Sequence, residues 1–247
     1  INRKGVRRCL RNFISKNIEG VILPSQNVCD WYNYNVSSKV NTLELPIIHD
    51  DLVFRKELEK SLLVSSEINK LDVINGKKII LYVGRLVEVK NLHFLINVIT
   101  QLETFDYCLV IVGDGELKAE LQAKTNKTES NIIFTGRKEG PELLAWYNLA
   151  NIFVLPSTYE PFGAVVNEAL LGGCHVLCSN KSGASSLIDS SNGELFDPYN
   201  EEELLNSLKK SLAQINLVQN DTITLRKNKM PFSFSGKIDE LILELLA

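Results

Sequence analysis

The sequence predicts an α/β fold built on a doubly wound parallel sheet. From residue 77, short apolar runs alternate with segments whose apolar residues recur at helical spacing. These runs do not alternate between apolar and polar residues, so we expect a sheet that helices cover on both faces. The predicted strands cover residues 78–83, 107–112, 131–134, 152–155 and 175–178. The predicted helices cover residues 91–102, 117–123, 141–149, 164–171 and 201–212.

Local signals at the ends of these helices support the assignment. Pro141 falls in the first turn of its helix, where a missing amide donor costs nothing. Gly172-Gly173 ends the helix that begins near Gly163. Either Asp197 or Asn200 could cap the helix that starts at residue 201. Ligands of such folds bind at the carboxyl ends of the strands, so the loops that follow the strands are the places to search.

The chain divides into three predicted parts. Residues 73–215 form the α/β domain, residues 1–72 are a remnant of an upstream domain plus a linker, and residues 216–247 are a tail that ends in a helix over 237–246. Within 1–72 the sequence predicts a strand at 21–23 and a second extended piece at 45–48. The first residue is Ile rather than Met, so we expect a fragment of a longer protein.

Composition narrows the class of function. A formal net charge of -3 gives no reason to expect a nucleic-acid partner. No apolar run reaches the roughly 18 residues that span a bilayer, and the N-terminus lacks the apolar segment of a signal peptide. We therefore expect a cytoplasmic protein. The basic stretch 3–16 could touch anionic lipid at the inner face of the membrane, although a solvated helix face is the favoured interpretation.

The cysteines predict neither disulfides nor a metal centre. No Cys-x-x-Cys pair occurs, and no histidine lies near a cysteine pair at ligand spacing. We expect buried free thiols in a reducing compartment. The five residues concerned are Cys9, Cys29, Cys108, Cys174 and Cys178.

The first predicted strand ends in Gly84-Arg85-Leu86, and Lys90 follows at the start of the next helix. Glycine lets the backbone turn sharply and lets a ligand approach. Two cations there suit a diphosphate. The alternative is a pair of surface charges, but cations at a helix N-terminus oppose the macrodipole, which favours a bound anion.

The second predicted strand ends in Gly113-Asp114-Gly115. A dinucleotide fingerprint would need a third glycine at the position of Lys118. A tight turn is therefore favoured over a nicotinamide-cofactor site, and no cofactor is predicted.

The fourth predicted strand leads into the most informative stretch, residues 156–169. The helix that begins near Gly163 has unpaired first amides at the strand-end cleft, which make a ready anion site. Glu160 lies in the loop before this helix and could be no more than a favourable charge at its positive end. Glu168 lies in the helix among apolar residues, where a carboxylate needs hydrogen-bond donors such as a ribose diol.

The Glu160-x7-Glu168 spacing within Glu-Pro-Phe-Gly-Ala-Val-Val-Asn-Glu-Ala resembles the signature of the retaining glycosyltransferases of family 4, which have the GT-B fold. Gly84-Arg85-Leu86 followed by Lys90-Asn91 resembles the second hallmark of that family, in the same order and at fitting spacing. The resemblance covers roughly residues 20–215 and implies a Rossmann-like donor-binding half of the GT-B fold.

The resemblance implies a role for each matching position. Arg85 and Lys90 would hold the donor diphosphate, Glu160 would bind hydroxyls of the donor sugar, and Glu168 would bind the nucleotide ribose. With Gly84, the backbone amides of Phe162, Gly163 and Ala164 would lie near sugar and phosphate. The loop around Arg137 would contact the base, and residues 180–184 would border the same cleft. Glu160, Arg85 and Lys90 are the predicted catalytic residues, and a covalent role for Glu160 is the disfavoured alternative.

The implied function is hexosyl transfer from a nucleotide-sugar donor, UDP being favoured over GDP or ADP, to a glycan or lipid-linked acceptor in bacterial polysaccharide or lipopolysaccharide synthesis. The acceptor pocket and a catalytic histidine would belong to the missing N-terminal domain. His49 and His93 are not candidates for that histidine by position: His49 is in the predicted linker and His93 is on a helix. Two alternatives stay open: a catalytically inactive nucleotide-binding or interaction domain, and a GT-B sugar-nucleotide epimerase.

Overall fold

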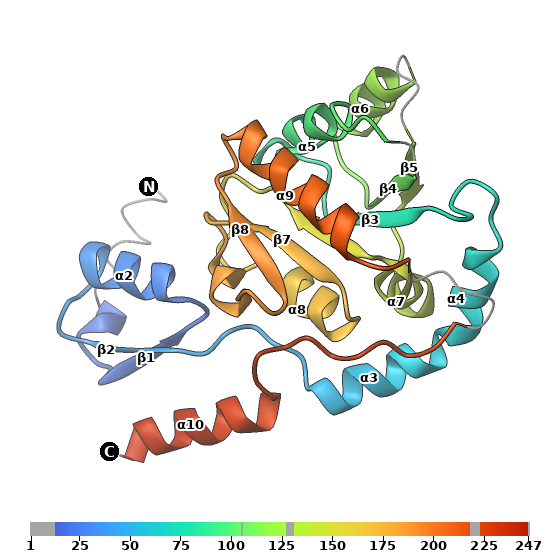
Figure 1. Cartoon of the computed structure of the whole chain (residues 1–247). Coiled ribbons are helices and arrows are strands. Elements are labelled where there is room, and N and C mark those ends of the chain that lie inside the picture. The colour runs from blue at the N-terminus through green and yellow to red at the C-terminus, as the bar shows by residue number, and fades with distance from the viewer. Residues whose placement is uncertain (1–12, 105, 127–130, 218–222, 247) are drawn as a thin grey trace.

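The computed structural model describes residues 13–104, 106–126, 131–217 and 223–246. Its main feature is a six-stranded sheet in which every neighbouring pair of strands is parallel (Figure 1). The α/β fold with a doubly wound parallel sheet is therefore confirmed. From one edge to the other the strands are β5 (Ile132–Gly136), β4 (Tyr107–Val112), β3 (Lys78–Val83), β6 (Ile152–Leu155), β7 (His175–Ser179) and β8 (Gly193–Phe196).

The order of the strands locates the expected ligand site. From β3 the chain moves outward to β4 and β5, then returns to β6 beside β3 and moves outward in the other direction. The loops after β3 and β6 thus leave the sheet on opposite sides of the point where the winding reverses. Open α/β sheets bind ligands in the crevice at that point.

Alternate side chains of the buried strands enter two separate cores. In β3, Ile79 and Leu81 belong to one core and Ile80 and Tyr82 to the other, and all four are fully buried. Two layers of helices cover the faces (Figure 1). One face carries α7 (Gly140–Leu149) and α8 (Ala164–Leu171), and the other carries α5 (Leu92–Ile99), α6 (Lys118–Thr125) and α9 (Glu201–Gln214).

Helix termini follow the sequence signals with one change. Asn200 caps α9 by accepting a hydrogen bond from the amide of Glu203, which decides between the two predicted caps. The predicted helix 91–102 is shorter: it starts at Leu92, because Asn91 adopts a left-handed conformation (φ 57°) between the short helix η1 (Glu88–Lys90) and α5, and it ends at Ile99. The Asn91 side chain donates to the carbonyl of Pro198 at 2.9 Å, which holds this turn against the loop after β8.

The N-terminal region forms a small parallel pair of strands that Figure 1 shows beside the main sheet. The strand that pairs with the predicted strand at 21–23 lies at 41–44, just before the extended piece predicted at 45–48. Pro46 supplies no amide hydrogen for a strand ladder. Three helices here were not predicted. The elements are β1 (Gly20–Leu23), α2 (Gln26–Asn35), β2 (Asn41–Glu44), α3 (Asp51–Lys60) and α4 (Leu62–Asn69).

Helices α3 and α4 pack on α7 of the main domain. The domain bounds at 72 and 215 stay a prediction, and most of the basic stretch 3–16 lies outside the described residues. Among the described residues, no helix combines the length and apolar character that crossing a bilayer requires.

The C-terminal segment runs back across the domain before its last helix, α10 (Phe234–Leu246). The partly buried Arg226 guanidinium donates to the carbonyls of Ala150 and Gly173, and the Lys229 amide donates to the Leu170 carbonyl at 2.9 Å. The predicted helix 237–246 is confirmed and starts three residues earlier.

The described cysteines are free and buried, as predicted, and Cys9 lies outside the described residues. Burial raises the pKa of the Cys108 thiol to about 11 and that of Cys178 to about 12. Both stay protonated at neutral pH and are therefore poor nucleophiles.

Candidate functional site

Glycines allow the loops after β3 and β4 to approach each other closely. A Cβ atom at Gly113 would lie 1.8 Å from the carbonyl oxygen of Gly84, and one at Gly115 would lie 2.4 Å from that of Leu86. The Leu86 amide donates to the Asp114 carbonyl at 2.9 Å in the same contact. Backbone packing thus accounts for both glycines of Gly113-Asp114-Gly115, which favours the tight-turn interpretation over a dinucleotide fingerprint.

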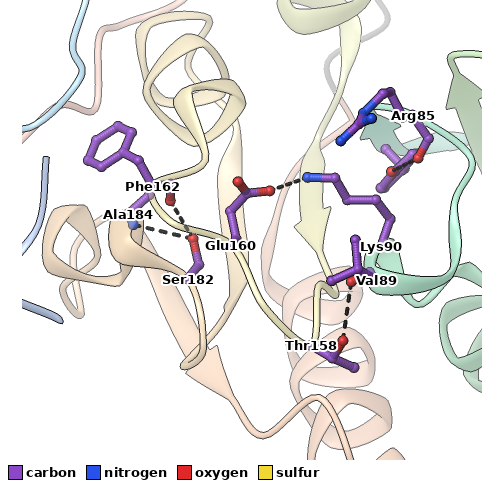
Figure 2. A network of polar contacts seen from close by, with 9 residues as sticks. Arg85, Val89, Lys90, Thr158, Glu160, Phe162, Ser182 and Ala184 are labelled. Carbon is purple, nitrogen blue, oxygen red and sulfur yellow. Dashed lines mark hydrogen bonds and ion pairs between the residues drawn. The ribbon is translucent and has the colours of Figure 1, made fainter. Parts of the chain in front are cut away.

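Helix η1 directs Lys90 across the end of the sheet toward the loop after β6. The Lys90 ammonium contacts the Glu160 carboxylate, and Figure 2 shows Arg85 and Lys90 on the same side, opposite Glu160. The Lys90 and Glu160 side chains are only 14% and 15% exposed. Thr158 donates from its amide to the Val89 carbonyl at 3.0 Å, which ties the two loops together. Residues 70 positions apart therefore form a partly buried ion pair where the winding reverses.

The loop that carries Glu160 is fixed by the segment after β7. The Gly183 amide donates to the Glu160 carbonyl at 2.9 Å, and the Ser182 hydroxyl and Ala184 amide both donate to the Phe162 carbonyl, at 2.7 and 2.6 Å. The Phe162 side chain is 2% exposed and belongs to the core. The structure thus places 180–184 beside the Glu160 loop, on the side where the sequence predicted the border of the cleft.

Gly163 joins this loop to α8. Its φ of 99° lies in the left-handed region that favours glycine, and a Cβ atom there would lie 3.0 Å from both Ser182 Oγ and Leu155 Cδ2. The helix begins at the next residue, Ala164, as predicted. The helix starts four residues after Glu160, and its Val166 amide donates to the Gly163 carbonyl at 2.9 Å, so Ala164 and Val165 carry the first amides that lack an acceptor within the helix. A partial positive charge therefore lies close to the Lys90–Glu160 pair.

Glu168 lies farther along α8, and each of its two carboxylate oxygens contacts a different side chain. The Tyr147 hydroxyl donates to Oε2 at 2.6 Å, and Nε2 of His49 lies 3.2 Å from Oε1. Burial foremost, and then the Glu168 charge, raises the pKa of Tyr147 well above its ordinary value, so the phenol stays a donor. The hydrogen bond to Glu168 raises the pKa of His49.

Two pockets flank the loop after β5. One of about 470 Å³ is lined by His49, Phe54 and Glu168 and by Gly140, the first residue of α7. The second, of about 480 Å³, is lined by Gly84, Arg85, Asp114 and the same loop's Arg137 and Lys138. Arg137 itself is 77% exposed and pairs with Glu139. Of the predicted site residues, the structure joins Lys90 to Glu160 and places Arg85 and Glu168 at separate pockets; the predicted roles of all of them stay predictions.

His49 is the residue at this site that the sequence did not indicate. Its position in a predicted linker argued against a role, yet 119 residues separate it from the carboxylate that it contacts. Only the packing of α3 and α8 brings the two together. Tyr147 was equally hidden, because an aromatic residue in an apolar helix is ordinarily a core residue.

Residues 65–220 match the protein family described as Glycosyl transferases group 1. The chain belongs to this family. The family assignment and the GT-B character of the fold, inferred from the two motifs, are thereby confirmed.

Two curated relatives show the range of the family. The chain is 36% identical over 145 residues to the N-acetylgalactosamine-N,N'-diacetylbacillosaminyl-diphospho-undecaprenol 4-alpha-N-acetylgalactosaminyltransferase of Campylobacter jejuni, covering 57% of this chain and 39% of the relative. It is 28% identical over 213 residues to the alpha-monoglucosyldiacylglycerol synthase of Streptococcus pneumoniae, covering 84% of this chain and 47% of the relative. The chain thus spans less than half the length of either relative.

Among solved structures, an Anabaena protein crystallised with UDP and glucose has the same fold. It superimposes with a TM-score of 0.74 at 20% identity, over 96% of this chain and 66% of the Anabaena chain.

Proposed function

We propose that this chain forms the nucleotide-sugar-binding half of a retaining hexosyltransferase. The contact between Lys90 and Glu160 carries the proposal. It places a cation and a carboxylate, both mostly buried, where an α/β sheet of this winding binds its ligands. A diphosphate and an adjoining sugar would use the two groups separately, the ammonium bonding to phosphate and the carboxylate to sugar hydroxyls.

The charges around Lys90 support a diphosphate site. Lys90 has three donors, of which Glu160 needs one, so two are available to phosphate oxygens. Arg85 follows β3 five residues before Lys90 and adds a second cation. The first amides of α8 add the positive end of a helix. No cofactor is needed in this scheme, because protein groups alone offset the diphosphate charge.

The pocket beside Glu168 supports a nucleoside next to that diphosphate. Arg137 and Lys138 line one pocket and Gly140, at the start of α7, lines the other, so a ligand that spans both pockets would pass this segment. A ribose would hydrogen-bond to Glu168, and the base would lie against the loop around Arg137. The Anabaena structure with UDP and glucose supports UDP as the favoured nucleotide.

Transfer would break the bond between the anomeric carbon and a phosphate oxygen. Negative charge grows on the leaving phosphate, and preorganised donors aimed at that charge lower the barrier. Arg85, Lys90 and the start of α8 would act there. The two relatives are named after a diphospho-undecaprenol and a glucosyldiacylglycerol, which supports a lipid-linked acceptor. That acceptor would bind to an upstream domain, so the chain alone would bind the donor without transferring sugar.

Thermal melting with UDP, GDP and ADP tests the proposal. A ligand that binds only the folded state raises the melting temperature in proportion to ln(1 + [L]/Kd). We expect UDP to raise it most. If none of the three nucleotides changes the melting temperature at millimolar concentration, the chain is an interaction domain rather than a donor-binding half. Sugar transfer by the 247-residue chain alone would refute the division into halves.

A further inference from the structure

The side chains that contact the two oxygens of Glu168 differ in how deeply they are buried. Tyr147, bound to Oε2, is fully buried and cannot leave. The His49 side chain, bound to Oε1, is 46% exposed, whereas that of Glu168 is 19% exposed. A ligand that needs Glu168 therefore meets an oxygen whose protein partner can be displaced.

The backbone of His49 is fixed even though its ring is exposed. Its amide donates to Oδ1 of Asn167 at 2.8 Å, and the next residue, Asp50, caps α3 through the amides of Leu52 and Val53. The imidazole packs at a tilt against the Phe54 ring, with centroids 5.2 Å apart. Rotation of the side chain alone would thus free Oε1 without moving α3 or α8.

Glu168 favours the protonated form of His49, because its hydrogen bond raises the pKa of His49 more than partial burial lowers it. The titratable groups that line the pocket with it are Glu168 on α8, Glu57 on α3 and Asp50 at the cap, and all three are acidic. Helix α7 contributes Gly140, Leu143 and Leu144, which do not titrate, and Tyr147, whose raised pKa keeps it neutral while it donates to Glu168. A proton on His49 strengthens its bond to Glu168, whereas a neutral ring gives that oxygen up more easily.

We propose that His49 competes with the nucleotide ribose for Oε1 of Glu168 and thereby determines how tightly the donor binds. The inference rests on the proposed function, because it assumes that a ribose diol uses this carboxylate. His49 is then a positioning residue that keeps Glu168 occupied in the free chain and turns away when the nucleotide enters.

The competition makes donor binding depend on pH. In the free chain the hydrogen bond to Glu168 raises the pKa of His49, and in the complex that bond is lost and the pKa returns toward its ordinary value. Binding then releases a proton, so affinity falls as the pH drops through the His49 pKa. A half-exposed ion pair contributes at most about 1 kcal/mol, which corresponds to about a fivefold change in Kd.

Calorimetry with UDP-glucose between about pH 8 and about pH 5.5 tests this competition, because both ends of its diphosphate are esterified and neither titrates in that range. The variant is His49→Gln, which keeps a neutral donor. The matched control is His93→Gln, since His93 lies at the same 3.2 Å from a glutamate, Glu120, on the other face of the sheet. The wild type and the control should bind about fivefold more weakly at the acid end, and His49→Gln should show little change.

Proton release gives a second readout, because the heat of binding in buffers of different ionisation enthalpy reports the protons exchanged. We expect release with the wild type and with His93→Gln, and none with His49→Gln. Equal pH dependence in all three proteins would overturn the competition while leaving donor binding intact. If UDP-glucose binds to none of them at any pH, the proposed function fails and this inference fails with it.

Discussion

Replacing Lys90 with methionine should separate phosphate binding from sugar binding. A hydrogen bond to a charged group contributes about 1.5–3 kcal/mol, and about 1.4 kcal/mol corresponds to a tenfold change in Kd. In the free chain Lys90 already contacts Glu160, so the ammonium is shared and the lower end of that range applies. We therefore expect Lys90→Met to weaken UDP binding by roughly tenfold, as measured by calorimetry.

The partner substitution should give a different pattern. Glu160→Gln removes a negative charge that competes for Lys90, so UDP should bind as tightly as before or up to severalfold more tightly. UDP-glucose should lose whatever affinity it has beyond that of UDP, because the carboxylate that accepts from the sugar hydroxyls is gone. The comparison of the two ligands thus assigns Lys90 to the phosphates and Glu160 to the sugar.

The control is Lys70→Met, which removes a lysine that is 70% exposed and pairs with Glu67 on the surface of α4. It should leave the affinity for both ligands unchanged. Melting curves should show that each variant is folded at the temperature of the titration. Equal losses of UDP affinity in Lys90→Met and Lys70→Met would refute the placement of the diphosphate. So would a large loss of UDP affinity in Glu160→Gln.

Three further substitutions, one of them with a matched control, test the structural reasoning by chemical denaturation at 25 °C. Gly113→Ala should lower the free energy of unfolding by more than about 2 kcal/mol, because its Cβ would overlap the Gly84 carbonyl. The control Gly76→Ala, at a residue with φ 70° and open space around it, should lower it by about 1 kcal/mol. Equal losses would contradict the close approach of the loops after β3 and β4. Leu208→Ala should cost about 2–5 kcal/mol, because the side chain is fully buried between α9 and the sheet, and a loss below about 1 kcal/mol would contradict that packing. Because the pKa of His49 is raised, its pair with Glu168 stabilises the fold below the ordinary histidine pKa of about 6.5, and this stabilisation is lost as pH rises through the folded-state pKa. His49→Gln should therefore lower the free energy of unfolding by up to about 1 kcal/mol near pH 5.5 and not at pH 8. A loss of stability that is independent of pH would contradict the ion pair.

The central sheet could be predicted because its signals are local. Apolar runs such as 78–83, with helices between them, determine the type and order of the elements without knowledge of distant contacts. Strand β8 was missed because Gly193–Phe196 is short and includes Glu194, whose charge is offset by Lys210 and Ser207 on α9. That compensation exists only in the folded chain.

The site shows the same division between local and tertiary information. Lys90, Glu160 and Gly163 could be proposed from the sequence because each lies at a strand end or helix start that the pattern locates. The contact of Lys90 with Glu160 also follows from strand order, since β3 and β6 are neighbours in the sheet. The contact of His49 with Glu168 could not be predicted, because it depends on how α3 packs against α8 and no residue near His49 in the sequence indicates that packing.

A crystal structure of the chain with UDP would test the central claim most directly. We expect a phosphate oxygen within about 3 Å of the Lys90 ammonium, which is hydrogen-bonding distance, with the first amides of α8 facing the same diphosphate. A ribose hydroxyl should replace His49 at Oε1 of Glu168. A diphosphate bound away from both Lys90 and the start of α8 would contradict the account.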